Sequence, residues 1–112
     1  MFTRRTTLSK FLIEQLKTSP DGQALAALLV DVAAAIKAIS AVAAKGALDG
    51  NAGSLDSHNV QGEIQKPLDL LTNEIILRHC DWGGLVAGMA SEEMEEPFAI
   101  PAEYERGRYL LL

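Results

Sequence analysis

One apolar stretch, from about Gln23 to Lys45, constrains the fold of this chain more than any other feature. It is very rich in alanine, only Asp31, Lys37 and Ser40 interrupt it, and Gly46 follows it. Alanine is the strongest helix former and glycine commonly follows a helix, so we predict one long helix that ends at Gly46. Because this helix is apolar around most of its circumference, we expect it to be buried on several sides or in a subunit interface.

The same helix is not predicted to cross a membrane. Asp31 and Lys37 lie near its middle, where charges are costly in hydrocarbon, and alanine contributes little free energy to insertion. The N-terminus does not have the pattern of a secretory signal either, because the segment Thr6–Lys10 is mostly polar where an apolar region is required. We therefore expect a cytoplasmic protein.

The size and charge of the chain indicate how many cores it has and which partners it is not expected to bind. A domain of 112 residues buries about two thirds of its unfolded surface, so one core is expected. The net charge of −5 gives no electrostatic attraction to nucleic acid or to an anionic membrane, so we expect neither as a partner. The single cysteine, Cys80, ends an apolar helix, and we predict a buried hydrophobic residue without a catalytic role.

Two further helices and a loop are predicted around the long helix. Apolar residues recur at helical spacing from Thr7 to Lys17, with Thr7 as the N-cap. They recur again after Pro67, a residue that suits the first turn of a helix, and Asp69 and Asn73 lie one turn apart toward one side of that helix. Between these helices, Leu48–Gly62 is rich in glycine, serine, asparagine and aspartate, which predicts a mobile loop that is either a lid or a plain surface connection.

The C-terminal part predicts strands. Leu85–Ala90 is a short apolar run bounded by glycines and closed by acidic residues, as in a buried strand. Phe98–Arg106 contains Pro101 and is flanked by Pro97 and Gly107, so we predict it to be a connection. We predict that Arg108–Leu112 is a second strand. A helix, a glycine turn and a strand form half of an α/β unit, so the fold class is α/β, or α+β within this chain.

Four acidic residues fall where predicted elements begin or end: Glu63 in the loop, Asp69 at a helix start, and Glu92 and Glu93 at a strand end. Mg²⁺ prefers oxygen ligands, and enzymes that act on phosphate esters hold it with several carboxylates. Glu92 and Glu93 can reach one site only if the strand ends before them, because adjacent side chains of a strand point to opposite faces. The alternative is that the run Glu92–Glu96 is a solvated turn and that Asp69 only stabilises a helix start.

Other catalytic chemistries have little support in the sequence. His58 and His79 have no second histidine or cysteine at the spacing of a zinc site. Neither of the common glycine-rich phosphate loops is present, and no Ser-His-Asp arrangement is indicated.

Several short segments follow one another in a specific order: Thr7–Gln15, Lys37–Ser40, Ala52–Ser54, Asn59–Glu63, Leu68–Asp69, Asn73–Glu74, Ala90–Glu93 and Gly107–Tyr109. Together they resemble the N-terminal third of class 1 fructose-1,6-bisphosphatase, especially the proteobacterial type. The resemblance implies a layered α/β sugar-phosphatase fold, beginning with two helices, a mobile loop, a third helix and the first strands.

The resemblance also implies a reaction and roles for the acidic residues. The family hydrolyses fructose 1,6-bisphosphate to fructose 6-phosphate and phosphate, in gluconeogenesis or the Calvin cycle, with Mg²⁺ or Mn²⁺ and usually as a homotetramer. Glu92 and Glu93 resemble its metal-ligand carboxylates, and we expect Glu93 to be a catalytic residue as well, together with Asp69 and Glu63. Asp69 resembles the aspartate that positions or deprotonates the attacking water, and Glu63 the acidic residue of the active-site loop.

Some residues depart from the family pattern. The loop has extra residues around Asp56–His58, and Pro67 stands where lysine is common. Many members bind AMP at the start of the second helix, where backbone N–H groups and hydroxyls hold the phosphate. Gln23–Ala26 offers no hydroxyl there, although Arg108-Tyr109 resembles the Lys-Tyr pair that completes the site. We therefore predict weak or absent AMP inhibition.

The aspartate-rich segment of the family, Asp-Pro-Leu-Asp-Gly-Ser-Ser, should follow Leu110–Leu112 and is not in this chain. We therefore expect residues 1–112 to be the N-terminal part of a single fructose-1,6-bisphosphatase domain, without the C-terminal remainder and inactive alone. Two alternatives stay open: another carboxylate-metal sugar or inositol phosphatase, and a non-catalytic helical interaction or oligomerisation module.

Overall fold

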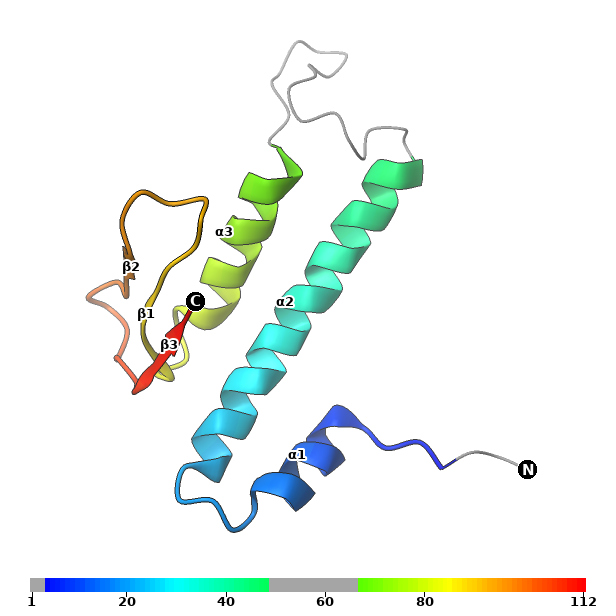
Figure 1. The fold of residues 1–112 in the computed structure, drawn as a ribbon, viewed down its shortest axis with the longest axis vertical. Helices are drawn as coiled ribbons and strands as arrows, with labels where there is room; N and C mark the ends of the chain where they lie inside the picture. Colours follow the sequence, from blue (N-terminus) through cyan, green and yellow to red (C-terminus); the bar gives the residue numbers. More distant parts are fainter. Residues whose placement is uncertain (1–3, 49–66) are drawn as a thin grey trace.

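The computed structural model describes residues 4–48 and 67–112 (Figure 1). Within these ranges, helices come first and strands last: α1 Leu8–Leu16, α2 Gly22–Leu48, α3 Leu68–Cys80, β1 Val86–Met89, β2 Phe98–Ala99 and β3 Tyr109–Leu111. The predicted α+β class is confirmed by this order. The loop predicted over Leu48–Gly62 lies almost entirely outside the described residues, as does Glu63.

Helix α1 begins where its cap was predicted. The Thr7 hydroxyl accepts a hydrogen bond from the Lys10 backbone N–H at 3.1 Å, and the Thr7 carbonyl accepts from the Phe11 N–H at 3.0 Å. The first bond satisfies an N–H group that a helix N-terminus would otherwise leave unpaired, and the second is the first regular bond of the helix. Leu12 is the buried residue of this helix, and α1 packs against α2.

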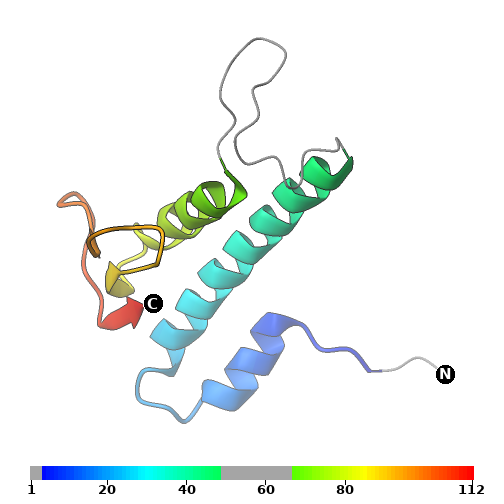
Figure 2. The same cartoon turned by 45° about the horizontal axis from the view of Figure 1, so that its top comes forward.

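Helix α2 differs from its prediction at its C-terminal end. It continues past Gly46 to Leu48, because a glycine inside a helix costs only about 1 kcal/mol relative to alanine and can be passed through. Within this chain the helix is covered only in part, and burial in a subunit interface stays our prediction. Helices α1 and α3 lie on different sides of it (Figures 1 and 2), and Leu29, Val30 and Ile36 remain 37%, 43% and 58% exposed.

By length and composition, the stretch Gly22–Gly46 is the one segment of the described helices that could cross a membrane. Asp31 and Lys37 lie within it, and α3 packs along the same helix. The absence of a membrane span therefore stays our prediction.

The sheet has β1 in its centre, in the order β2-β1-β3. Met89 of β1 lies opposite Phe98 in antiparallel β2 and opposite Leu111 in parallel β3. Both predicted strands are confirmed, whereas the interpretation of Phe98–Arg106 as a pure connection is wrong because β2 lies inside it. A strand of two residues is too short to show an alternating pattern, and it forms only because β1 pairs with it.

A small core lies between α2, α3 and the sheet. Its buried members come from all three parts: Leu28, Cys80, Val86, Met89 and Ile100. Cys80 is 1% exposed, so its predicted burial is confirmed. Burial raises the pKa of its thiol, and the negative charges of Asp31 and Asp81 raise it further, which keeps the thiol protonated and unreactive.

Candidate functional site

A hollow of about 380 Å³ lies between α3 and the turn that follows β1. Among the described residues, its lining comes from these two segments: Leu68, Asp69, Thr72, Asn73 and Ile76 from the helix, and Ser91, Glu92 and Glu93 from the turn. The structure therefore places three predicted site residues, Asp69, Glu92 and Glu93, around one space. The fourth, Glu63, lies outside the described residues.

The helix wall of the hollow is set by where α3 begins. Pro67 immediately precedes the helix with φ −54° and ψ 145°, and its carbonyl accepts the Leu71 N–H at 3.0 Å. Pro67 was predicted inside the first turn and is instead the residue before it. From this start, Asp69 and Asn73 are four residues apart and share one face of the helix, as predicted.

The opposite wall is a tight turn. Strand β1 ends at Met89, and the Ser91 carbonyl then accepts the Met94 N–H at 3.2 Å, which makes Glu92 and Glu93 the central residues of a four-residue turn. The strand alternation is broken at this point. Two adjacent carboxylates can therefore line one hollow. This meets the condition stated above, that Glu92 and Glu93 can share a site only if the strand ends before them.

A hydrogen bond joins the two walls. The Ser91 hydroxyl donates to Asn73 Oδ1 at 2.5 Å, and the same hydroxyl accepts the Glu93 backbone N–H at 3.2 Å. Sequence reasoning placed Asn73 beside Asp69 but assigned no role to Asn73 or Ser91. Their positions next to predicted acidic residues were the available signal, but the contact between them depends on how β1 packs beside α3.

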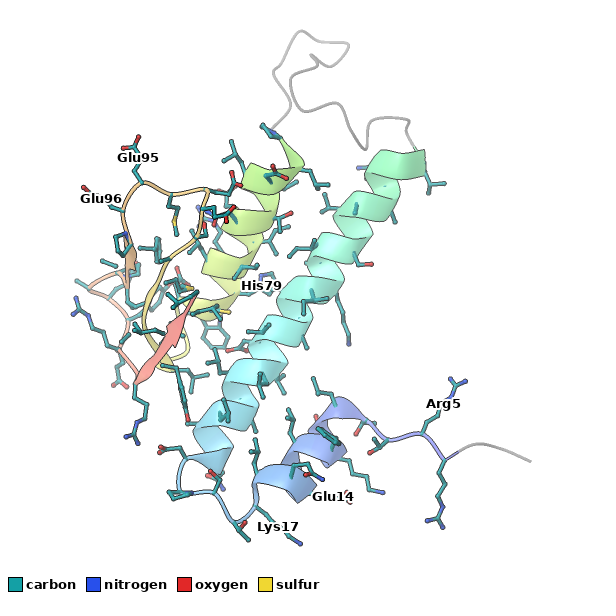
Figure 3. All side chains as sticks on the ribbon, in the orientation of Figure 1. Arg5, Glu14, Lys17, His79, Glu95 and Glu96 are labelled. Carbon is teal, nitrogen blue, oxygen red and sulfur yellow. The ribbon has the colours of Figure 1, made fainter. Side chains whose placement is uncertain are left out.

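The remaining acidic residues of the run point elsewhere. Glu95 and Glu96 are exposed, and their side chains point away from α3 into solvent (Figure 3). The interpretation as a solvated acidic turn therefore fits these two residues. Glu92 and Glu93 are also exposed, but they border the hollow.

The donor atoms of the hollow suit a hard divalent cation. Carboxylate, hydroxyl and amide oxygens are the ligands that Mg²⁺ and Mn²⁺ prefer. In the part of the chain that the structure describes, however, no three His, Cys, Asp or Glu side chains are grouped closely enough to hold a metal ion. The donor chemistry fits the predicted metal, while the described carboxylates alone do not form a complete site.

A second structural link was missed at the sequence level. The Arg108 guanidinium, just before β3, donates to both carboxylate oxygens of Asp21 at 2.7 Å, which ties β3 to the turn before α2. Asp21 also lines another cavity, of about 580 Å³, at the corner between α1 and α2. The corner includes Gln23, Ala24 and Ala26, where the absence of a hydroxyl led us to predict poor AMP binding.

A comparison with protein families bears directly on this arrangement. The family model described as fructose-1-6-bisphosphatase, N-terminal domain, matches residues 6–112. The match includes every helix and strand described above and therefore both walls of the hollow.

Proposed function

The chain belongs to the fructose-1,6-bisphosphatase family, and we propose from this that it is part of an enzyme that hydrolyses fructose 1,6-bisphosphate to fructose 6-phosphate and phosphate. The observation that supports the proposal within this chain is the convergence of Asp69, Glu92 and Glu93 on one hollow. We assign the chain to the proteobacterial class 1 type, on the order of the segments that resemble it.

The carboxylates divide between two roles in the proposed mechanism. Glu92 and Glu93, at adjacent positions of the turn, would hold Mg²⁺ or Mn²⁺ through their carboxylate oxygens. A bound cation of this kind neutralises charge on the phosphoryl group. Asp69, on the opposite wall, orients the attacking water and accepts its proton while the water oxygen bonds to phosphorus. The bond from phosphorus to the sugar oxygen breaks, and the sugar oxygen takes up a proton from solvent to become a hydroxyl. Glu63 adds a further carboxylate from the preceding segment.

Metal binding by the 112-residue chain tests this assignment. The free Mn²⁺ signal in electron paramagnetic resonance measures the dissociation constant, and Glu92→Gln and Glu93→Gln should each weaken binding by about tenfold or more, since each removes a charged ligand. Glu96→Gln is the matched control, because Glu96 lies in the same acidic run and points into solvent (Figure 3). Equal effects of all three substitutions, or no Mn²⁺ binding at millimolar concentration, would contradict the proposal.

We expect little or no turnover from these 112 residues alone. The described carboxylates do not group into a three-ligand metal site, and phosphoryl transfer depends on several groups that position and neutralise the phosphate. Phosphate release from fructose 1,6-bisphosphate at a rate well above background would overturn this expectation. Inositol phosphates and other sugar phosphates in the same assay test the alternative of a related phosphatase.

We propose that the chain forms a homo-oligomer, and the exposed apolar face of α2 supports this. The resemblance to the family suggests a tetramer. Leu29 and Ile36 lie two turns apart on one face of α2 and are 37% and 58% exposed, and apolar residues gathered on an exposed face mark surfaces that bind a partner. Sedimentation velocity measures the assembly state, and a strict monomer would contradict this part of the proposal. Self-association without any Mn²⁺ binding would instead favour the non-catalytic oligomerisation module.

We further propose a cytoplasmic location and weak or absent inhibition by AMP. The Arg108 side chain is already paired with Asp21, so an incoming phosphate would have to displace a carboxylate. Inhibition of the active enzyme by micromolar AMP would contradict this proposal.

A further inference from the structure

The hydrogen bond between α3 and the acidic turn assigns a role to two residues that do not themselves carry the proposed chemistry. We propose that Asn73 and Ser91 are positioning residues, which fix the turn carrying Glu92 and Glu93 against the helix carrying Asp69. This inference rests on the proposed function, since it concerns the alignment of the carboxylates that would hold the cation.

Ser91 is suited to this role because its hydroxyl makes contacts in two directions. A serine hydroxyl has one donor hydrogen and two acceptor lone pairs. The hydrogen goes to Asn73 Oδ1 at 2.5 Å, and one lone pair accepts the Glu93 N–H at 3.2 Å. The backbone carbonyl of Ser91 closes the turn by accepting from Met94 at 3.2 Å. One residue thus holds both the internal shape of the turn and its attachment to α3.

Asn73 is suited to receive this contact because it is neutral and lies on a rigid element. Its amide oxygen accepts the hydrogen bond without adding another negative charge beside Asp69, Glu92 and Glu93. It lies one helical turn after Asp69 on α3, so the position of Asp69 and the anchor point of the turn are set by the same helix. Side chains held by hydrogen bonds on rigid elements are how proteins keep metal ligands aligned.

The contact has little part in holding the fold together. Ser91 is exposed, and the core lies between α2, α3 and the sheet rather than at this turn. Substitutions at the contact should therefore leave the chain folded and change the turn alone. This separation makes the inference testable without an unfolded variant.

The test compares Ser91→Ala, which removes the hydroxyl, with Ser91→Thr, which keeps it, and with Asn73→Ala, which removes its acceptor. Ser40→Ala, at an exposed serine of α2, is the matched control. The first measurement is hydrogen exchange of the Glu93 amide by NMR in the metal-free chain. Ser91→Ala should accelerate it about fivefold, the equivalent of one ordinary hydrogen bond, while Ser91→Thr and Ser40→Ala should leave it unchanged.

The second measurement is the Mn²⁺ dissociation constant. Ser91→Ala and Asn73→Ala should each raise it by about tenfold, the low end of what is found for residues that orient metal ligands. The double substitution should add little to either single one, because both remove the same link. Ser91→Thr should restore binding.

The outcomes separate this inference from the proposed function. If the wild-type chain binds Mn²⁺ and Ser91→Ala binds it equally well, the positioning role is overturned while the proposed function stands. If the wild-type chain binds no Mn²⁺, the proposed function fails, and a faster Glu93 exchange in Ser91→Ala then shows that Asn73 and Ser91 only hold the turn, which also overturns their role toward a cation.

Discussion

Replacing Gly107 by alanine tests how closely the segment before β3 must approach the segment before β1. A Cβ atom at this position would overlap the backbone carbonyl of Leu85 and the carbonyl oxygen of Gly84. Among the described glycines only Gly84 has a positive φ, so the need for glycine at position 107 is one of space and not of backbone conformation.

The cost follows from what must move. Nonbonded carbon atoms normally stay about 3.5 Å or more apart, so the segment has to shift by about 1.4 Å from the Leu85 carbonyl carbon, which is backbone and cannot rotate away. The shift breaks or lengthens two hydrogen bonds, from the Gly107 N–H to the Val86 carbonyl at 3.0 Å and from the Tyr109 N–H to the Leu85 carbonyl at 3.2 Å. At about 1 kcal/mol for each of the two bonds, with a further 1–3 kcal/mol for overpacking, we expect a loss of about 3–5 kcal/mol in the free energy of unfolding.

Urea unfolding followed by far-UV circular dichroism measures this loss. Gly88→Ala is the matched control, since Gly88 lies in β1 and its added Cβ would stand 3.5 Å from the nearest atom, the Phe98 carbonyl oxygen, which is an ordinary contact. We expect Gly88→Ala to remain within about 0.5 kcal/mol of wild type. Equal stabilities of the two variants would refute the steric argument.

Three further predictions concern single residues. Thr7→Ala should lower the free energy of unfolding by about 1 kcal/mol because the bond to the Lys10 N–H is lost, with Thr7→Ser as the control; equal losses for both would contradict the cap. Cys80 should resist a thiol reagent in the native chain and react in urea, because it is 1% exposed and burial raises the pKa of its thiol; rapid native labelling would contradict this. Burial raises the pKa of the Asp31 carboxyl above its ordinary value of 3.8, and the charge of His79 offsets this in part. Protonated Asp31 therefore stabilises the fold below pH 3.8, and this stabilisation is lost as the pH rises through the folded-state pKa. Over that interval the free energy of unfolding of Asp31→Asn should rise relative to that of wild type. A difference between the two proteins that does not change with pH in urea titrations would contradict this prediction.

The candidate site was predictable in its parts. Asp69 and Asn73 were expected on one helix face because a spacing of four residues is a property of the helix itself. Glu92 and Glu93 were expected at a strand end because an apolar run stops just before them. That they line the same hollow as Asp69 could not be read from these local patterns, because it depends on β1 leaving the core beside the start of α3.

Local chemistry determined the helices, the Thr7 cap and the strands β1 and β3, since each depends on residues within a few positions of one another. Tertiary structure decided what local rules leave open. Strand β2 exists through its pairing with β1, the Ser91 hydroxyl finds Asn73 across 18 positions of sequence, and Arg108 finds Asp21 across 87. Such contacts depend on the packing of whole elements, so local patterns could indicate the carboxylates that line the hollow but not the hydrogen bond beside them.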